Sequence, residues 1–480
     1  MRLNKLLGGV GHNSIINEKN VCVSCLCHNS NCCEQGALFF CIKGENFNGE
    51  DYAVDAVKNG AVAIVTECEL HDLNVIQILV DNARIAMAEI SRRFYDFPDK
   101  KLKIISFVGT NGKTTSSHVL CKILQENGKR CGIIGTNGII IDELSLPSEL
   151  TTPDPIELYY TLNQMVVLGF EYVVLEASAH AIALNKLYGL KNEVVVFTNI
   201  SNEHLDFFNS MEEYSKVKMD YVNNRNSNFM VVNADDEYGA KIIKDAKIEF
   251  SSYGIFNPAS TFAIDIKTSM TGSEFVVNAD DNIINVKTKL VGDFNVYNIL
   301  SAISCAKYFE IDNETIEKAI SKLEKVDGRF NVFELSGNRK VVVDFAHTPD
   351  GFEKTLSLIR KLRKGKIIVV FGCVGYSDKK KRTLMGQVAN KYADYIIITN
   401  DNICDAVFNE VNSDVIKGIT CDIEIIFNRE KAVEKALNMM KNNHTLVLLG
   451  KGCETYQKIK GEKVYYSDIE TVKKYINKNK

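Results

Sequence analysis

The stretch KIISFVGTNGKTTSSHVLCKILQENG, residues 103–128, joins three local patterns that decide the fold. Its apolar start predicts a buried strand, and its second half predicts a helix that ends at a glycine C-cap. Between them stands GTNGKTT, residues 109–115, whose glycines leave backbone N–H groups free to cradle a phosphate. The helix N-terminus adds a partial positive charge at the same point. The stretch therefore predicts a nucleotide-binding unit of strand, loop and helix.

The residue types in this loop fit nucleotide phosphates. Lys113 is placed to reach the β- and γ-phosphates, and the Thr114 hydroxyl is suited to ligate magnesium. The spacing differs from the eight-residue Walker A pattern, because the first glycine stands only three residues before the second. A plain glycine turn before a helix is the alternative. The coincidence of strand, G-K-T-T and helix favours the phosphate loop.

Strands and helices alternate on both sides of this unit, which predicts an α/β fold with a mostly parallel sheet. Two breaks divide the pattern, FYDFPDKKLK at residues 94–103 and EKVDGRFNVFE at residues 324–334. We predict three domains: a small N-terminal α/β domain (1–100), a central P-loop domain (101–328) and a C-terminal Rossmann-like domain (329–480). The apolar runs that predict strands include residues 36–44, 61–66, 103–110, 171–178, 193–201, 228–236, 340–347, 366–375, 394–400, 423–427 and 444–452.

Composition sets the class of protein. The 480 residues are 45% apolar and 25% charged, as in ordinary globular domains. The net charge of −4 does not indicate a broad basic surface for binding nucleic acid. No apolar run approaches the roughly 18 residues that suggest a membrane span. The start of the chain lacks a sustained apolar region, so we expect no signal peptide, no membrane insertion and a cytoplasmic location.

Five of the fourteen cysteines fall within VCVSCLCHNSNCC, residues 21–33, together with His28. A zinc or iron–sulfur site is conceivable there, although structural zinc usually shows two separated pairs of ligands. Cys25 and Cys27 alternate as neighbours on a strand do, which favours ordinary packing or a hairpin. The other nine cysteines are scattered and indicate reduced cytosolic thiols.

Two more predicted strands end in side chains that can do chemistry. Glu176 and His180 lie at the end of one, and His204 and Asp206 lie at the end of another. Any one of them alone would more often be structural. Together with a phosphate loop in the same sheet, a carboxylate, an imidazole and the Thr114 hydroxyl suit magnesium bound with nucleotide phosphates.

With these motifs in order, the chain resembles the Mur ligases, the ATP-dependent amide ligases that build the stem peptide of peptidoglycan. It is most similar to the MurE type, which adds the third residue to UDP-N-acetylmuramoyl-L-Ala-D-Glu. The resemblance implies ATP and two magnesium ions as cofactors, a nucleotide-sugar dipeptide and an amino acid as substrates, an acyl-phosphate intermediate, and a monomer. The motifs that carry it are GTNGKTT (109–115), TTPDP (151–155), NEHLDFF (202–208), MEEYSKVK (211–218), GDFNVYN (292–298), DGRF (327–330), DFAHTPD (344–350) and GKGCETYQ (450–457).

The family's functional residues fall on matching positions of this chain. The resemblance implies that Lys113, Glu176, His204 and Lys218 are catalytic, and that Lys218 is carbamylated to N6-carboxylysine. An ordinary surface lysine is the alternative at position 218. The further implied sites are Gly109, Thr110, Asn111, Gly112, Lys113, Thr114, Thr115, Asn295, Asn298, Arg329 and Asp344 for ATP; Thr114, Glu176, His204 and Lys218 for metal; Ser30, Thr151, Thr152, Ser178 and Lys186 for the UDP-substrate; and Ser377, Asp401, Asn402, Cys404, Gly450 and Glu454 for the amino acid.

The substrate half departs from the family pattern. Residues 29–31 are NSN where the family has D-S-R, EASAH has Ala179 in place of a serine, and Lys186 replaces an arginine. Arginines that contact the incoming amino acid are replaced by Ser377 and Cys404. Ser377 stands in GYSDK (375–379), where the family has G-D-R-D-K, and Cys404 stands in DNIC (401–404), where the family has D-N-P-R. A further departure is GKGCE (450–454), where the family has G-K-G-H-E.

These changes bear on the amino acid that is added. A bidentate pair between arginine and carboxylate contributes about 1.5–3 kcal/mol, and neither serine nor cysteine can replace it. We therefore predict a third residue other than meso-diaminopimelate, with Lys379, Lys380, Lys381 and Arg382 as candidates to compensate. Two other functions stay open: a paralogue that joins a different carboxylate and amine in a specialised pathway, and a non-catalytic nucleotide-binding protein.

Overall fold

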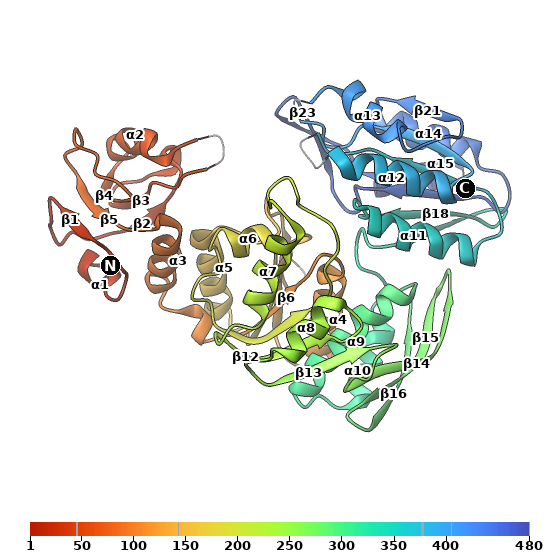
Figure 1. The fold of residues 1–480 in the computed structure, drawn as a ribbon, viewed down its shortest axis with the longest axis horizontal. Coiled ribbons are helices and arrows are strands. Elements are labelled where there is room, and N and C mark those ends of the chain that lie inside the picture. The colour runs from red at the N-terminus through yellow and green to blue at the C-terminus, as the bar shows by residue number, and fades with distance from the viewer. Residues whose placement is uncertain (45–46, 143, 376–378, 405, 480) are drawn as a thin grey trace.

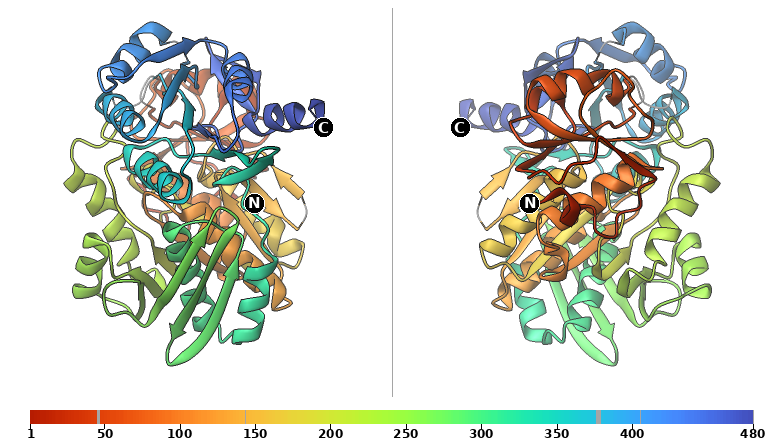
Figure 2. Two further views of the ribbon diagram at one scale, coloured as in Figure 1. Left: turned by 90° about the vertical axis from the view of Figure 1, so that its right-hand side faces the viewer. Right: turned by 90° about the vertical axis from the view of Figure 1, so that its left-hand side faces the viewer.

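The computed structural model describes residues 1–44, 47–142, 144–375, 379–404 and 406–479. The strands of these residues form three main sheets, which succeed one another along the chain. Figure 1 shows the three lobes that they build, coloured red to orange, orange through yellow to green, and teal to blue. In the two side views of Figure 2, the first and last lobes both lie on the same side of the middle lobe. The predicted α/β class with mostly parallel sheets is confirmed.

The N-terminal lobe contains a sheet in the order β1-β5-β4-β3-β2, in which β1 is antiparallel and the other described strands are parallel. The helix α3 begins with an N-cap, since the Asn82 side chain accepts hydrogen bonds from two N–H groups of the first turn. The bounds are α1 (Leu3–Leu6), β1 (Ser14–Ile16), β2 (Cys25–Cys27), η1 (Ser30–Cys32), β3 (Ala37–Phe40), η2 (Gly49–Tyr52), α2 (Ala53–Lys58), β4 (Ala61–Thr66), β5 (Ile76–Leu79), α3 (Ala83–Phe94) and η3 (Pro98–Lys100).

The middle lobe contains the largest sheet, in the order β16-β15-β14-β13-β12-β11-β6-β10-β7-β8-β9 for its described strands. Its bounds are β6 (Lys103–Val108), α4 (Lys113–Glu126), β7 (Cys131–Gly135), β8 (Gly138–Ile141), β9 (Leu144–Leu146), α5 (Pro155–Val167), β10 (Tyr172–Ala177), α6 (Ala179–Ala183), β11 (Asn192–Phe197), α7 (Met211–Val222), β12 (Ser227–Asn233), α8 (Glu237–Lys244), β13 (Phe250–Gly254), β14 (Thr261–Ser269), β15 (Gly272–Ala279), β16 (Asn282–Thr288), α9 (Asp293–Tyr308) and α10 (Asn313–Lys322).

Both faces of the central strands of this sheet are buried, which explains their continuous apolar runs. Alternate residues of β6 point to opposite sides: Ile105 and Phe107 pack into one apolar cluster, and Ile104 and Val108 pack into the other. Residues of α4, α9 and α10 complete the first cluster, and residues of α5 and α7 contribute to the second. The sheet is therefore fixed between two layers of helices, and its strand ends are rigid supports.

The C-terminal lobe has a sheet in the order β17-β18-β22-β19-β20-β21, where only β17 is antiparallel among the described strands. A separate hairpin, β23 and β24, follows it. The bounds are β17 (Asn331–Leu335), β18 (Arg339–Asp344), α11 (Pro349–Leu362), β19 (Ile367–Phe371), α12 (Lys379–Tyr392), β20 (Tyr395–Thr399), α13 (Phe408–Ile416), β21 (Ile423–Ile426), α14 (Arg429–Met439), β22 (Thr445–Leu449), β23 (Tyr456–Ile459), β24 (Glu462–Tyr465) and α15 (Asp468–Lys478).

The cysteine-rich segment differs from the predictions. Cys25 and Cys27 do lie on one strand, β2, but this strand pairs parallel to β3 and forms no hairpin. Cys27 and Cys33 are joined in a disulfide, with 5.9 Å between their Cα atoms, which the spacing did not predict. Within the described residues, no group of three or more His, Cys, Asp or Glu side chains is arranged to hold a metal ion, and this gives the zinc alternative no support.

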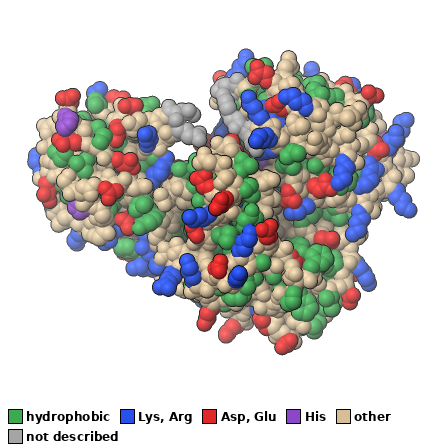
Figure 3. All heavy atoms as spheres, viewed as in Figure 1, with side chains coloured by type: hydrophobic (Ala, Val, Ile, Leu, Met, Phe, Trp, Pro, Cys, Tyr) green, Lys and Arg blue, Asp and Glu red, His purple; other side chains and the backbone are tan. Residues whose placement is uncertain are grey.

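The surface agrees with the mixed composition. On the face shown in Figure 3, Lys and Arg side chains are interspersed with Asp and Glu side chains. Among the described helices, none is both long enough and apolar enough to span a bilayer.

Candidate active site

The ends of three neighbouring strands of the middle sheet meet at one cavity. In this sheet β6 lies between β10 and β11, and both pair parallel to it. The carboxyl ends of parallel strands are the usual place for a ligand in an open α/β sheet. A cavity of about 840 Å³ opens there, and residues of the middle and C-terminal lobes line it together.

The loop after β6 has the backbone that a phosphate loop needs. Gly109 and Gly112 both have positive φ, at 154° and 93°. A Cβ atom at Gly109 would lie 1.9 Å from Thr198 Oγ1, and one at Gly112 would lie 2.3 Å from Asn298 Oδ1. Both positions therefore require glycine. The end of β11 holds the loop in place, because Thr198 Oγ1 donates to the Asn111 carbonyl at 2.8 Å.

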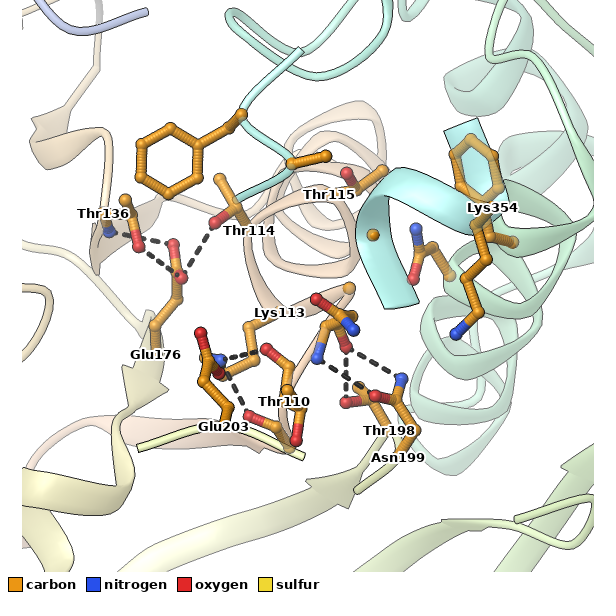
Figure 4. Close-up of a pocket in the computed structure, with 18 of the residues that line it drawn as sticks. Thr110, Lys113, Thr114, Thr115, Thr136, Glu176, Thr198, Asn199, Glu203 and Lys354 are labelled. Atoms are coloured by element: carbon orange, nitrogen blue, oxygen red, sulfur yellow. Dashed lines mark hydrogen bonds between the residues drawn. The ribbon is translucent and has the colours of Figure 1, made fainter. Parts of the chain in front are cut away.

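Lys113 is the first residue of α4 and points into the loop, as Figure 4 shows. Its ammonium donates to the carbonyl oxygens of Gly109 at 2.8 Å and Thr110 at 3.0 Å. Burial lowers the pKa of Lys113, whereas the carboxylates of Glu203 and Glu176 raise it. The chain thus places a cation at the N-terminus of a helix, where anionic phosphate is favoured.

Glu176, at the end of β10, is buried and fully engaged. Its carboxylate accepts hydrogen bonds from the Thr114 hydroxyl at 2.9 Å and from the hydroxyl and the N–H of Thr136, each at 3.0 Å (Figure 4). Arg329 of the C-terminal lobe donates to Thr114 Oγ1 at 2.8 Å. The hydroxyl and the carboxylate form an oxygen pair of the kind that would hold Mg²⁺. These residues fit a nucleotide-bound magnesium ion.

His204 and Lys218 lie on the other side of the loop. Burial lowers the pKa of His204 to about 4, so the imidazole is neutral near pH 7 and has a lone pair for a metal. Lys218 is only 1% exposed, whereas Lys216 is exposed, so position 218 is not an ordinary surface lysine. The Lys218 ammonium contacts the Tyr214 hydroxyl and donates to Thr110 Oγ1 at 3.2 Å. Burial lowers the pKa of Lys218 well below its usual value, which favours the neutral amine that reacts with CO₂.

The remaining residues predicted to bind ATP line the same cavity from α9 and the C-terminal lobe. Asn298 Nδ2 donates to Asn295 Oδ1 at 3.0 Å, which fixes both amides on one face of α9. The Asp344 carboxylate, at the end of β18, accepts from the N–H groups of Phe330 at 2.7 Å and Ala346 at 2.9 Å. Two lobes therefore contribute to one nucleotide-sized site.

Comparison with known proteins agrees with this geometry. Three family models match in order: "Mur ligase family, catalytic domain" at residues 23–95, "Mur ligase middle domain" at 108–306, and "Mur ligase, glutamate ligase domain" at 328–452. The UDP-N-acetylmuramoyl-L-alanyl-D-glutamate--2,6-diaminopimelate ligase of Caldanaerobacter subterraneus subsp. tengcongensis is 37% identical over 480 residues, which is 99% of both chains. The chain belongs to the Mur ligase family.

Further relatives have the same description. The enzyme of that name from Aquifex aeolicus is 38% identical over 450 residues, 93% of this chain and 92% of its own. A solved structure of a UDP-N-acetylmuramoyl-L-alanyl-D-glutamate--2,6-diaminopimelate ligase has a TM-score of 0.69 at 28% identity, and the match covers 97% of each chain. Like other Mur ligases, this chain is an ATP-dependent ligase.

The residues that the Mur ligase pattern predicts for the UDP-substrate fall in two places. Thr151, Thr152, Ser178 and Lys186 line the nucleotide cavity. Lys186 is largely buried there and pairs with Asp154 at 2.9 Å. Ser30 lies apart from them, on η1 of the N-terminal lobe.

The residues that the pattern predicts for the amino acid form a separate cluster in the C-terminal lobe. Asn402 Nδ2 donates to Glu454 Oε2 at 3.1 Å, and a Cβ at Gly450 would lie 2.6 Å from Asp401 Oδ2. The backbone of Cys404 is tied to the hairpin, since its N–H donates to the Lys458 carbonyl at 3.0 Å. Ser377 lies outside the described residues.

Arg382, one of the residues expected to compensate for the missing arginines, makes several contacts within the C-terminal lobe. It is buried, pairs with Asp414 at 3.1 Å, and donates to the carbonyls of Val374 and Gly375. Its guanidinium therefore stabilises α12 and the loop before it, and its compensating role stays a prediction.

Sequence reasoning missed several residues that the fold brings to the site. The Glu203 carboxylate is buried 3.1 Å from His347 Nε2 of the C-terminal lobe and 3.5 Å from His204 Nε2. Burial alone would raise its pKa, but the hydrogen bond from His347 and the neighbouring positive charges lower it far below the usual value. Other lining residues that were missed include Thr136, Thr198, Asn199, His347 and Lys354. Glu203 lies in the motif NEHLDFF, and His347 lies in the motif DFAHTPD.

We expect Glu203→Gln to lower kcat about tenfold, because the amide keeps the shape but removes the charge that pairs with the histidines and faces Lys113. The measurement is steady-state phosphate release at saturating ATP. Glu193→Gln is the matched control, since Glu193 is the same residue type on β11 and lies outside the cavity lining. Equal rates for the two variants would contradict the role of Glu203.

Proposed function

We propose that the chain joins an amino acid to the free carboxylate of UDP-N-acetylmuramoyl-L-Ala-D-Glu, with ATP, in peptidoglycan synthesis. The single observation that carries the proposal is that Thr151, Thr152, Ser178 and Lys186 line the same cavity as the phosphate loop. A substrate carboxylate held there lies beside the γ-phosphate. The names and full-length coverage of the relatives support the same reaction.

The mechanism follows from the positions of the charges. Lys186 and the Ser178 hydroxyl hold the substrate carboxylate, which attacks the γ-phosphate; the bond from that phosphorus to the bridging oxygen breaks, ADP leaves, and an acyl phosphate forms. Lys113 and the helix N-terminus stabilise the charge that develops on the phosphoryl oxygens. The amine of the amino acid then attacks the activated carbonyl and phosphate leaves. Magnesium, when bound by Thr114 and Glu176, neutralises phosphate charge.

The lobes are proposed to act by closure. Arg329 and His347 reach from the C-terminal lobe to Thr114 and Glu203 of the middle lobe, so the site is complete only when the two lobes meet. We further propose a second magnesium ion held by His204 and by Lys218 in its carbamylated form. We also propose, as the resemblance implies, that the protein is a cytoplasmic monomer.

The acceptor has two candidates. The names of the relatives support 2,6-diaminopimelate and point away from the prediction made from Ser377 and Cys404, so we propose it as the first candidate. An acceptor without a second carboxylate is the alternative. Cys404 favours it, because a thiol cannot form the paired hydrogen bonds that a guanidinium gives to a carboxylate.

A panel of acceptors decides between them. Phosphate release and product mass are measured with UDP-N-acetylmuramoyl-L-Ala-D-Glu, ATP and either meso-diaminopimelate, lysine, ornithine or alanine. We expect the preferred acceptor to exceed the others at least about tenfold in kcat/KM. If diaminopimelate is a poor acceptor, Cys404→Arg should improve it, with Cys421→Arg, an exposed cysteine in the same lobe, as control. No turnover with any acceptor would refute the proposed substrate.

A further inference from the structure

The predicted UDP-binding loop of the N-terminal lobe is closed by a covalent bond that no part of the proposed reaction uses. Cys27, the last residue of the edge strand β2, and Cys33 form a disulfide. The segment between them contains η1 and Ser30, the residue matched to the nucleotide-sugar site. The bond therefore encloses the binding loop itself.

Among the described residues, the hydrogen bonds of this loop are short-range with one exception, and η1 also packs against α2. The Asn29 side chain caps η1 by accepting from the Asn31 N–H at 3.0 Å, and the Cys33 N–H donates to the Ser30 carbonyl at 3.2 Å. The long-range bond comes from Asn59, whose Nδ2 donates to the same carbonyl at 3.0 Å. A three-residue 3₁₀ turn with so few anchors depends on its ends for its shape.

The fold is compatible with both redox states. Cys27 and Cys33 are 6% and 8% exposed and pack in an apolar cluster with Phe39 and Ile64. A buried free cysteine behaves as a small apolar side chain, so the cluster stays packed after reduction. Cys32 is exposed directly beside Cys33, which places the bond next to solvent. Reduction would therefore remove the covalent closure of the loop while the lobe stays folded.

We propose that Cys27 and Cys33 form a reversible disulfide that holds the Ser30 loop in its nucleotide-sugar-binding conformation. The inference rests on the proposed function for the identity of the ligand. Two thiols of a small reductant such as glutathione reduce the bond: the S–S bond breaks, Cys27 and Cys33 each gain a proton and an electron, and the reductant leaves as its disulfide. The reverse exchange with glutathione disulfide restores the bond.

The test compares the full-length protein after equilibration with glutathione disulfide or with glutathione. Alkylation and tandem mass spectrometry locate the bond, and calorimetry measures the affinity for UDP-N-acetylmuramoyl-L-Ala-D-Glu. We expect a Cys27–Cys33 bond in the first sample only, and a Kd about fivefold or more higher in the second, because an ordered loop binds without being ordered first. The affinity for ATP should be unchanged.

Two pairs of variants separate loop closure from general thiol effects. Cys27→Ala/Cys33→Ala should show the weaker affinity in both samples, and Cys22→Ala/Cys32→Ala, which changes the two neighbouring exposed cysteines, should still respond to glutathione. Absence of the bond with glutathione disulfide, or equal affinities in the two samples, would overturn the inference.

Hydrogen exchange distinguishes failure of the disulfide inference from failure of the proposed function. If neither sample binds the nucleotide sugar or turns it over, the proposed substrate is wrong. Amide exchange over residues 29–34 then decides the inference: faster exchange after reduction supports a loop held by the disulfide, and unchanged exchange overturns it.

Discussion

Lys113→Ala should lower the ATP-dependent ligation rate about a thousandfold, the largest effect that we expect on catalysis. The wild-type ammonium lies at the start of α4 and is held by the carbonyls of Gly109 and Thr110. Phosphoryl transfer has little covalent help from protein groups, so this fixed charge carries much of the stabilisation. Alanine leaves the helix intact, since it is the best helix former.

The measurement is product formation at saturating substrates, together with ATP binding by calorimetry. Lys122→Ala is the matched control, because Lys122 lies on the same helix but outside the cavity. We expect Lys122→Ala to stay within about twofold of the wild type. A Lys113→Ala enzyme that retains a tenth of the activity would contradict the role of the loop as the phosphate site.

Strands and helices were predictable from the sequence where a single local pattern determines the element. The apolar run at 103–108 became β6, and the predicted helix after it became α4, followed by Gly128 with a positive φ of 73°. The central strands were predictable because burial on both faces leaves an unbroken apolar run. The antiparallel strands β14, β15 and β16 were missed, since their exposed positions alternate with buried ones and dilute that signal.

Only site residues that match a functional position of a family motif were predicted from the sequence. The family pattern placed Glu176, Arg329 and Asp344 in one cavity, and the structure brings them together. The contact of Glu203 with His347 joins residues 144 positions apart, and only the closure of two lobes creates it. The disulfide was missed for a similar reason: five cysteines in twelve residues allow many pairings, and strand register decides among them.

The amino acid that is added was harder to predict from the sequence. The prediction rests on two positions, Ser377 and Cys404, at which the family has arginine. The preference for one acceptor over another is set by the difference between the affinities for the two complete substrates. Relatives that are 33–38% identical to this chain carry 2,6-diaminopimelate in their names. Only the acceptor panel compares the two quantities directly.

Asp468→Ala should destabilise the C-terminal lobe by about 3–5 kcal/mol, the largest structural effect that we expect. Asp468 and Arg429 are both completely buried, and two hydrogen bonds of 2.9 and 2.7 Å join the carboxylate to the guanidinium. Burial alone would lower the pKa of Arg429, but the Asp468 charge raises it above its usual value. Removing the carboxylate therefore leaves a charged guanidinium in the core.

We expect Asp468→Ala to affect the predicted amino-acid site as well. Arg429 Nη2 also donates to the carbonyl of Leu449 at 2.8 Å, directly before Gly450. Amide hydrogen exchange of β22 is the suitable measurement, because a chain of several lobes does not unfold in one two-state step. Glu424→Ala, which removes an exposed pairing with Lys435, is the control and should change stability by no more than about 1 kcal/mol.

A double variant separates the penalty of an unpaired charge from the net contribution of the pair. Arg429→Met/Asp468→Leu replaces both charges with apolar groups of similar size, and such exchanges are often neutral or stabilising. We expect it to recover most of the stability that Asp468→Ala loses. If the double variant is as unstable as the single one, the hydrogen bonds to Asp468 and Leu449, rather than the unpaired charge, hold the lobe together.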